Sequence, residues 1–139
     1  YLTIAIAVAQ SFGMAIGMAS WRRDGFVSLH GGSQGGELLT RPFIVRGPNL
    51  HLNLDASDGE CVVQVCDLQG APRTGQDVHS PYLQGTGDWG VSRWSQPVRG
   101  DELDVTVAWS DDDLRYRIGK PVTLRIKLTN ADLYSFWVE

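Results

Sequence analysis

Strict alternation of apolar and polar residues marks the C-terminal part of the chain. Within residues 122–129, a large aliphatic residue occupies every second position, and Thr, Arg or Lys fills the positions between. This period of two predicts a strand with one buried side and one solvated side. Residues 130–132 (NAD) predict a turn, and Leu133–Val138 is apolar at most positions. We expect this last strand in the middle of a sheet, covered on both faces.

The first part of the chain alternates in the same way but carries no charge up to Ser20. Larger residues alternate with small ones before and after a turn at Gln10–Gly13. This pattern predicts a hairpin packed inside a crowded sandwich. A membrane span or signal segment is the alternative, because the uncharged stretch is followed by Trp21-Arg22-Arg23. The alternation favours the hairpin.

Short apolar runs separated by turn residues fill the region that follows. The expected elements are a turn at Asp24-Gly25, a strand at Phe26–His30, an extended stretch at Glu37–Val45 with an edge or bulge at Pro42, a half-buried strand at Leu50–Asp55, a hairpin turn at Ser57–Glu60 and a strand at Cys61–Leu68. Glycine and proline thus divide this region into many short segments, as in all-β proteins.

Residues 73–102 show no regular period, and we interpret them as one long loop. A loop of that length inside a compact domain is unusual and usually functional. Alternation returns at Leu103–Trp109, and residues 111–113 (DDD) predict a turn. The elements add up to about nine strands, and the fold expected is all-β, a jelly-roll or concanavalin-like β-sandwich.

The composition sets limits on size and class. The 139 residues are enough for one domain and one core, so residues 1–139 are expected to form a single β-sandwich domain. A hydrophobic content of 42% with 20% charged residues indicates a globular chain. The net charge of −4 argues against nucleic-acid binding. Because the chain begins at Tyr1 without Met, we interpret it as a processed product or a part of a longer protein.

Both cysteines fall on one predicted strand. Cys61 and Cys66 are five residues apart, which places them on opposite faces and roughly 16 Å from each other. That separation excludes a disulfide between them while the strand is intact. We expect two buried thiols, with an intermolecular disulfide as the alternative, so the cysteines do not fix the compartment.

The long loop contains the best candidate for a binding site. Sugar rings present apolar faces and polar edges, which proteins hold by stacking aromatic rings and by hydrogen bonding around the rim. The candidate glycan platform consists of Tyr82, Trp89 and Trp94 for stacking, with Asp88 and Arg93 for the hydroxyl groups. The alternative is a hydrophobic plug that packs the loop onto the domain.

Carboxylates near the end of the loop are weaker candidates. Asp101, Glu102 and Asp104 lie close together in the sequence, but no apolar surroundings are evident that would divide acid from base. We therefore expect solvated turn and edge residues and no catalysis by this chain alone.

Metal sites are not expected, apart from a possible structural calcium. Asp55, Asp58 and Asp132 are loop acids of the kind that bind calcium, but they lack the spacing of a ligand loop. The three histidines, His30, His51 and His79, are scattered singly, which argues against a transition-metal site.

Three stretches together resemble a known family. They are residues 21–29 (WRRDGFVSL), 36–43 (GELLTRPF) and 119–136 (GKPVTLRIKLTNADLYSF). In this order they resemble the C-terminal β-sandwich module that follows a β-propeller in glycoside-hydrolase-like proteins of the sucrase, sialidase and arabinosidase-like propeller group, planctomycete-type. Residues 76–99 look longer than the connection that the family has at this point.

The resemblance implies a module without catalytic residues of its own, located outside the cell or in the periplasm. The family's catalytic carboxylates lie on the propeller, and no position here matches them. We expect an accessory module that stabilises a propeller partner, with glycan binding as an additional candidate role, no cofactor and no membrane span. The alternative is a structural or interaction domain without a small ligand, for which a homo-oligomer is one candidate arrangement. A free-standing enzyme is the third alternative.

Overall fold

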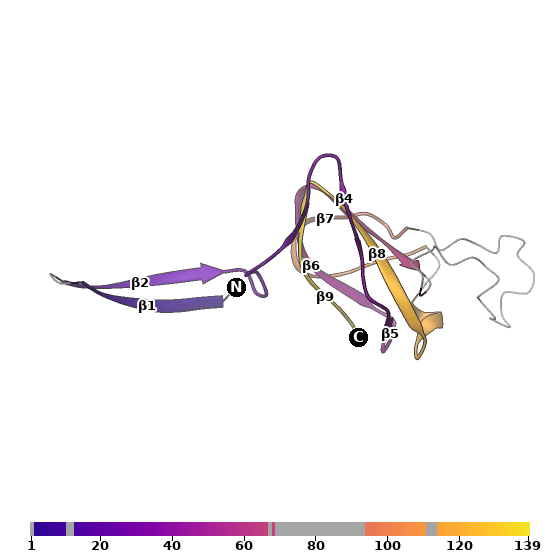
Figure 1. Cartoon of the computed structure of the whole chain (residues 1–139), viewed down its shortest axis with the longest axis horizontal. Helices are drawn as coiled ribbons and strands as arrows, with labels where there is room; N and C mark the ends of the chain where they lie inside the picture. The colour runs from indigo at the N-terminus through magenta and orange to yellow at the C-terminus, as the bar shows by residue number, and fades with distance from the viewer. Residues whose placement is uncertain (1, 11–12, 67, 69–93, 111–113) are drawn as a thin grey trace, which may run out of the picture.

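The computed structural model describes residues 2–10, 13–66, 68, 94–110 and 114–139 (Figure 1). Its strands are β1 (Leu2–Gln10), β2 (Gly13–Trp21), β3 (Leu29–Gly31), β4 (Gly36–Leu39), β5 (Phe43–Ile44), β6 (Leu50–Cys66), β7 (Val98–Thr106), β8 (Pro121–Thr129) and β9 (Ala131–Val138). A short 3-10 turn, η2 (Arg115–Arg117), precedes β8. The predicted all-β class is therefore confirmed.

Among the described residues, the body of the molecule is a seven-stranded sheet built around β6 and the successive strands β8 and β9 beside it. β6 runs for 17 residues, and β8 and β9 lie antiparallel to it in succession, with only Asn130 between them. β7 also pairs with β6. The outer partners are β4 and β5 on β8, and β3 on β9. The final strand thus lies between β3 and β6, inside the sheet as the sequence predicted. The expected cover on both of its faces is not found, because residues 134–138 are only half-buried.

β6 and the successive strands β8 and β9 beside it, which we call the two long strands of the body, bend at the same place. Asp55 pairs with Asp132, and Glu60 pairs with Thr129. Four residues of β6 therefore lie opposite only two residues between β8 and the paired part of β9. Asn130 has a φ of 44°, in the left-handed region that Asn tolerates. A Cβ on Gly59 would overlap the carbonyl oxygen of Thr129, so only glycine permits this close approach. The sheet as a whole is curled and nearly closed.

The core lies inside the curl. Its members are apolar residues that are at most 8% exposed, and most come from the long strands: Val45, Leu50, Leu52, Leu54, Ala56, Cys61, Val63, Val65, Val98, Val107, Leu114, Val122, Leu124, Ile126, Leu128, Ala131 and Leu133. The buried side of the alternation predicted at 122–128 is confirmed, because its four aliphatic residues are buried. The other side is solvated only in part, because Thr123 is buried as well. Cys61 and Cys66 are both buried, which confirms the prediction of buried thiols.

Several predicted boundaries were wrong. The hairpin turn predicted at Ser57–Glu60 is the bend within β6, because this strand continues along its partners instead of reversing. Likewise, the turn predicted at 130–132 does not fold β8 against β9; the two strands follow each other along β6. The strand predicted at Phe26–His30 is only Leu29–Gly31.

Two other predictions need correction near edges and loops. The extended stretch at Glu37–Val45 divides into β4 and β5, both paired with β8, with Pro42 in the gap between them. The loop predicted at 73–102 ends earlier, because Val98 to Glu102 belong to β7 and pair with β6. The turn predicted at 111–113 lies outside the described residues.

The N-terminal hairpin forms, but not in the predicted surroundings. β1 and β2 pair from Leu2↔Trp21 to Gln10↔Gly13, and in the described part of the chain they pair only with each other. Instead of lying inside a sandwich, the hairpin extends away from the curled sheet (Figure 1). We call β1 and β2 together the arm, and the seven-stranded sheet the body.

No helix that could cross a membrane is found among the residues with a described structure.

Candidate functional site

The predicted glycan platform lies almost entirely outside the described residues. Tyr82, Asp88, Trp89 and Arg93 belong to that undescribed stretch. Trp94 is described and is 38% exposed, so one aromatic ring of the predicted set is accessible to solvent. The platform as a whole remains a prediction.

The residues directly after Trp94 are fixed to the body. The Ser95 amide donates to the Val63 carbonyl at 2.7 Å, and the Val63 amide donates to Ser95 Oγ at 2.9 Å. The Gln96 amide donates to the Ala108 carbonyl at 2.7 Å. Because these bonds hold the chain on β6, Trp94 stands beside a rigid support.

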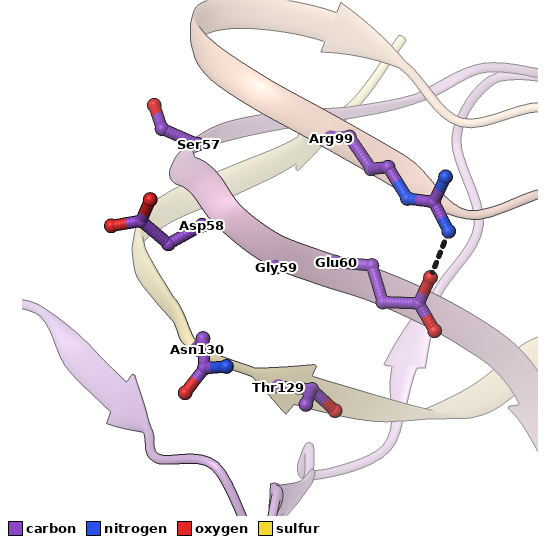
Figure 2. A pocket seen from close by; sticks show the side chains of 7 residues that line it. All are labelled: Ser57, Asp58, Gly59, Glu60, Arg99, Thr129 and Asn130. Atoms are coloured by element: carbon purple, nitrogen blue, oxygen red, sulfur yellow. Dashed lines mark hydrogen bonds and ion pairs between the residues drawn. The ribbon is translucent and has the colours of Figure 1, made fainter.

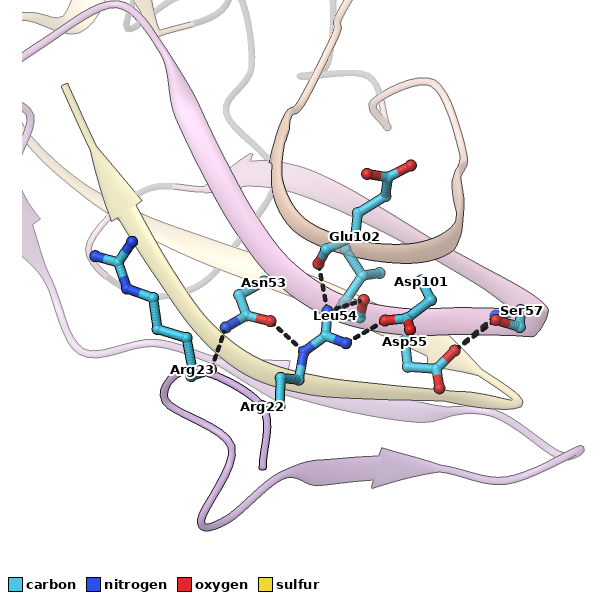
Figure 3. Close-up of polar contacts among 8 residues, drawn as sticks. All are labelled: Arg22, Arg23, Asn53, Leu54, Asp55, Ser57, Asp101 and Glu102. Atoms are coloured by element: carbon cyan, nitrogen blue, oxygen red, sulfur yellow. Dashed lines mark hydrogen bonds and ion pairs between the residues drawn. The ribbon is translucent and has the colours of Figure 1, made fainter. Parts of the chain in front are cut away.

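A polar cluster around one buried arginine lies elsewhere, where the arm joins the body. Arg22 follows β2 directly and is only 9% exposed. Its Nε donates to Asn53 Oδ1 at 2.5 Å, and one terminal nitrogen donates to the carbonyls of Leu54 at 2.9 Å and Glu102 at 2.6 Å (Figure 3). The guanidinium therefore contacts both β6 and β7.

Further contacts complete the environment of this side chain. The other terminal nitrogen of Arg22 forms an ion pair with Asp101. The guanidinium carbon lies 4.7 Å from the centre of the Tyr134 ring on β9, a cation–π geometry. Asn53, which is 1% exposed, donates its Nδ2 to the Arg23 carbonyl at 2.8 Å. We call Arg22, Asn53, Asp101 and Tyr134 the anchor.

The anchor fixes the position at which the arm leaves the body. A buried charge is tolerated only when it is paired and hydrogen-bonded, and the planar guanidinium presents its donors in a rigid fork. Arg22 uses that fork on three strands of the body. The residue next to it, Trp21, is the last residue of the arm, so the end of β2 is held in one place.

Two pKa shifts accompany this cluster. Burial raises the pKa of Tyr134, and the negative charge of Asp132 adds to the rise. Hydrogen bonds from the Ser57 hydroxyl and amide to Asp55 Oδ1, at 2.7 and 3.1 Å, lower the pKa of the Asp55 carboxyl. Both shifts report local hydrogen bonding and burial, and neither produces a base or an acid poised for catalysis near neutral pH.

Apolar side chains are exposed around the base of the arm. Met18 is 80% exposed, Phe26 is 73% exposed and Val27 is 76% exposed. The Phe26 ring meets the Trp21 ring edge-on, with centroids 5.1 Å apart. Exposed apolar residues gathered in one region mark interaction surfaces more often than isolated ones do.

The carboxylates of β7 are exposed, as predicted, and two of them have partners. Asp101 pairs with Arg22, and Asp104 Oδ1 lies 2.7 Å from His51 Nδ1. The His51 ring stacks on Trp137 at 5.2 Å, and its Nε2 lies 3.4 Å from Glu139. This cluster joins β6, β7 and the end of β9, which is a structural role.

A polar groove lies at the bend of the long strands. It is open to solvent, and its lining residues are Ser57, Asp58, Gly59, Glu60, Arg99, Thr129 and Asn130 (Figure 2). Arg99 donates to Glu60 at 2.7 Å within it. None of the described residues that line the groove is aromatic, so this part of the chain offers no stacking surface for a sugar there.

Two of the three predicted calcium ligands lie opposite each other, because Asp55 on β6 pairs with Asp132 on β9, but their carboxylates have separate partners. Asp55 accepts hydrogen bonds from Ser57, whereas Asp132 accepts one from Ser28 Oγ at 2.9 Å and lies 3.2 Å from His30 Nδ1. Within the described ranges, no group of three metal-ligating side chains forms a site. A structural calcium remains a prediction without supporting geometry.

Comparisons with protein families, curated proteins and solved structures found nothing that matches this chain. The resemblance to a propeller-associated module therefore remains an interpretation of the sequence.

Sequence reasoning missed the anchor and the isolation of the arm. Arg22 and Arg23 are adjacent, and the sequence pattern indicated only that both follow the uncharged N-terminal stretch as a positive flank. In the structure Arg22 is buried and Arg23 is exposed. One signal was available: Asn53 interrupts the leucines of a strongly apolar strand, and a buried amide requires partners.

Proposed function

We propose that this chain is a non-catalytic accessory module that stabilises a partner domain, and that the arm is the element that docks. The observation that carries the proposal is the arm itself. It has no charged residue, extends away from the body and pairs only within itself among the described strands. Apolar strands in this situation are templates for association with another chain or domain.

The anchor supports the proposal, because binding by a rigid element costs less conformational entropy than binding by a flexible one. Arg22 holds the last residue of β2 against three strands of the body. The exposed Met18, Phe26 and Val27 extend the apolar region from the arm onto its base. A partner seated on the arm would cover these residues as well.

The resemblance supplies the identity of the partner. We take it to be a β-propeller domain of carbohydrate-active type, in a protein located outside the cell or in the periplasm. On this reading the body is a curled variant of the jelly-roll or concanavalin-like sandwich. The pairing of Asp101 and Asp104 with Arg22 and His51 supports a structural role for these carboxylates.

Glycan binding by residues 82–94 is a second proposal, supported by one described feature. The exposed Trp94 lies next to the firmly held Ser95, so a stacking ring there would have a fixed position. A glycan array with the wild-type chain and with Trp89→Ala and Trp94→Ala tests it. Absence of binding, or binding unchanged in both variants, would contradict the platform.

The accessory role is tested in the complete gene product that contains this chain. We expect the thermal unfolding temperature of the domain ahead of Tyr1 to fall by about 5 °C or more when residues 1–139 are deleted. Differential scanning calorimetry resolves the two transitions. An unchanged transition of that domain would contradict the role. Homo-oligomerisation, the remaining alternative, is tested by light scattering on the isolated chain.

A further inference from the structure

The register of the arm places apolar residues on both of its faces. Residues paired across an antiparallel ladder lie on the same face. The register of one face pairs four residues of β1 with four of β2: Leu2, Ile4, Ile6 and Val8 with Trp21, Ala19, Gly17 and Ala15. The register of the other face pairs the residues between them: Thr3, Ala5, Ala7 and Ala9 with Ser20, Met18, Ile16 and Met14. Each face thus combines mostly large residues from one strand with mostly small residues from the other.

This pattern differs from that of a hairpin that lies on a surface. A strand pair with one solvated face alternates apolar with charged or polar residues, as β8 does. The arm has only Thr3 and Ser20, near its base, and Gln10, near its tip, as polar residues in β1 and β2. An occupant that covers one face would leave the other apolar face in water.

The surface area of the arm also favours an occupant that covers both of its faces. Two strands of nine residues form a ribbon roughly 30 Å long and 10 Å wide, so each face offers on the order of 300 Å² of planar area. A stable interface needs about 800 Å² of accessible surface from each partner. Two arms stacked face to face fall short of this, and they leave the second face of each arm uncovered. Both faces and both edges together approach the required area.

The edges of the arm are also unprotected. Natural edge strands carry lysine, proline or bulges that prevent pairing. Neither β1 nor β2 has a charged residue or a proline, and their register runs without a shift from Leu2 to Trp21. Backbone groups on the outer sides are therefore regularly spaced, as a neighbouring strand requires.

We infer that the arm is donated as a pair of strands into an incomplete sheet of the partner domain. The partner is a layered β-domain whose sheet lacks these strands, and its apolar layers cover both faces of the arm. This inference rests on the proposed function and specifies how the module is attached. Docking of the arm on a surface and pairing of two copies of this chain are the competing outcomes.

Adjacent residues on opposite faces provide the test. Met18 pairs with Ala5 on one face, and Ala19 pairs with Ile4 on the other. In the complete gene product, Met18→Arg and Ala19→Arg should each lower the unfolding temperature of the domain ahead of Tyr1 by about 5 °C or more, because each buries an unpaired charge. The matched control is Leu39→Arg on β4, 48% exposed in the body, which should leave that temperature unchanged.

Hydrogen exchange gives a second readout that does not depend on the variants. The amides of β1 and β2 should exchange at least about 100-fold more slowly in the complete gene product than in the isolated chain, including amides on the outer edges. Protection of both strands supports donation. Two outcomes would overturn the donation of the arm and leave the proposed function standing. One is slow exchange confined to one of the two strands, and the other is a lowered unfolding temperature with only one of the two face variants.

Two results would overturn both proposals together. One is an unfolding temperature of the domain ahead of Tyr1 that neither variant changes, together with arm amides that exchange as fast as in the isolated chain. The other is a gene product with no domain ahead of the arm. In that case, sedimentation showing a dimer that only one face variant dissociates would assign the arm to a second copy of this chain.

Discussion

The arm and the body are both built from alternating apolar strands, yet they bury their residues differently. Leu50, Leu52 and Leu54 of β6 are fully buried in the core of the curled sheet. Met18 of β2 alternates in the same way and is 80% exposed. Alternation therefore specifies a strand in both regions, whereas burial depends on what the rest of the chain can place over it. The body supplies its own cover, and the arm does not.

The connection between the two regions should have the largest effect on stability. Arg22→Ala removes the donors for Asn53, Asp101 and two carbonyls, and leaves buried acceptors without partners. We expect the free energy of unfolding of the body to fall by about 3 kcal/mol. Urea denaturation followed by tryptophan fluorescence measures it.

Arg23→Ala is the matched control for this experiment. The Arg23 side chain is 80% exposed, and only its backbone carbonyl takes part in the anchor. Its replacement should change the free energy of unfolding by less than about 0.5 kcal/mol. Equal losses in the two variants would show that Arg22 does not join the arm to the body.

Within the body, the bend should be the most sensitive backbone position. Gly59→Ala would drive a Cβ into the Thr129 carbonyl, and we expect the free energy of unfolding to fall by about 2 kcal/mol. Gly32→Ala, where the added Cβ meets no atom within 4 Å, should have almost no effect. The same denaturation assay compares them, and a stable Gly59→Ala variant would argue against the shared bend of the long strands.

Burial in the body should also appear as a dependence of stability on alkaline pH. Burial raises the pKa of Cys61 from 9.0 to about 12, so the unfolded chain releases its proton first. The contribution of the protonated Cys61 thiol to the free energy of unfolding is complete below pH 9. It is lost as the pH rises toward 12, at up to about 1.4 kcal/mol per pH unit.

The difference between wild type and Cys61→Ala isolates this effect from other groups that titrate in the same range. We expect the loss of stability between pH 9 and 11 to be steeper in wild type than in the variant, measured by urea denaturation at each pH. Identical slopes would mean that the thiol is accessible in the folded chain.

The smallest effect is expected at the exposed side of the bend. Hydrogen bonds from Ser57 lower the pKa of the Asp55 carboxyl, so the ionised carboxylate stabilises the folded chain. This contribution to the free energy of unfolding is present above the ordinary carboxyl pKa and is lost as the pH falls through the lowered value. Ser57→Ala should shift the Asp55 titration upward, toward its ordinary position, as measured by carboxyl-detected NMR. An unchanged titration would show that these hydrogen bonds do not persist in solution.

The sequence predicted the parts of the fold that depend on local pattern. Period-two alternation correctly identified Val122–Leu128 as a buried strand and the first residues as a hairpin. It did not distinguish a turn from a bend at Ser57–Glu60, because Asp-Gly suits both a reversal and a bulge. That outcome depends on Thr129, which lies about 70 residues away and forms the opposite side of the bend.

The candidate site was less predictable. The role of Arg22 arises from contacts with β6, β7 and β9, which are distant in sequence, and nothing local separates it from Arg23. For the glycan platform, the sequence supplied residue types without positions, and among them the structure describes only Trp94.

Hydrogen exchange of the isolated chain tests most directly whether the arm lacks the cover that the body provides. We predict that amides in the core of β6, such as those of Val63 and Val65, exchange about 1,000-fold or more slowly than amides of β1 and β2. The exchange of the arm should not depend on protein concentration. Protection of the arm equal to that of β6 would contradict the account, because the arm would then be covered within the chain itself.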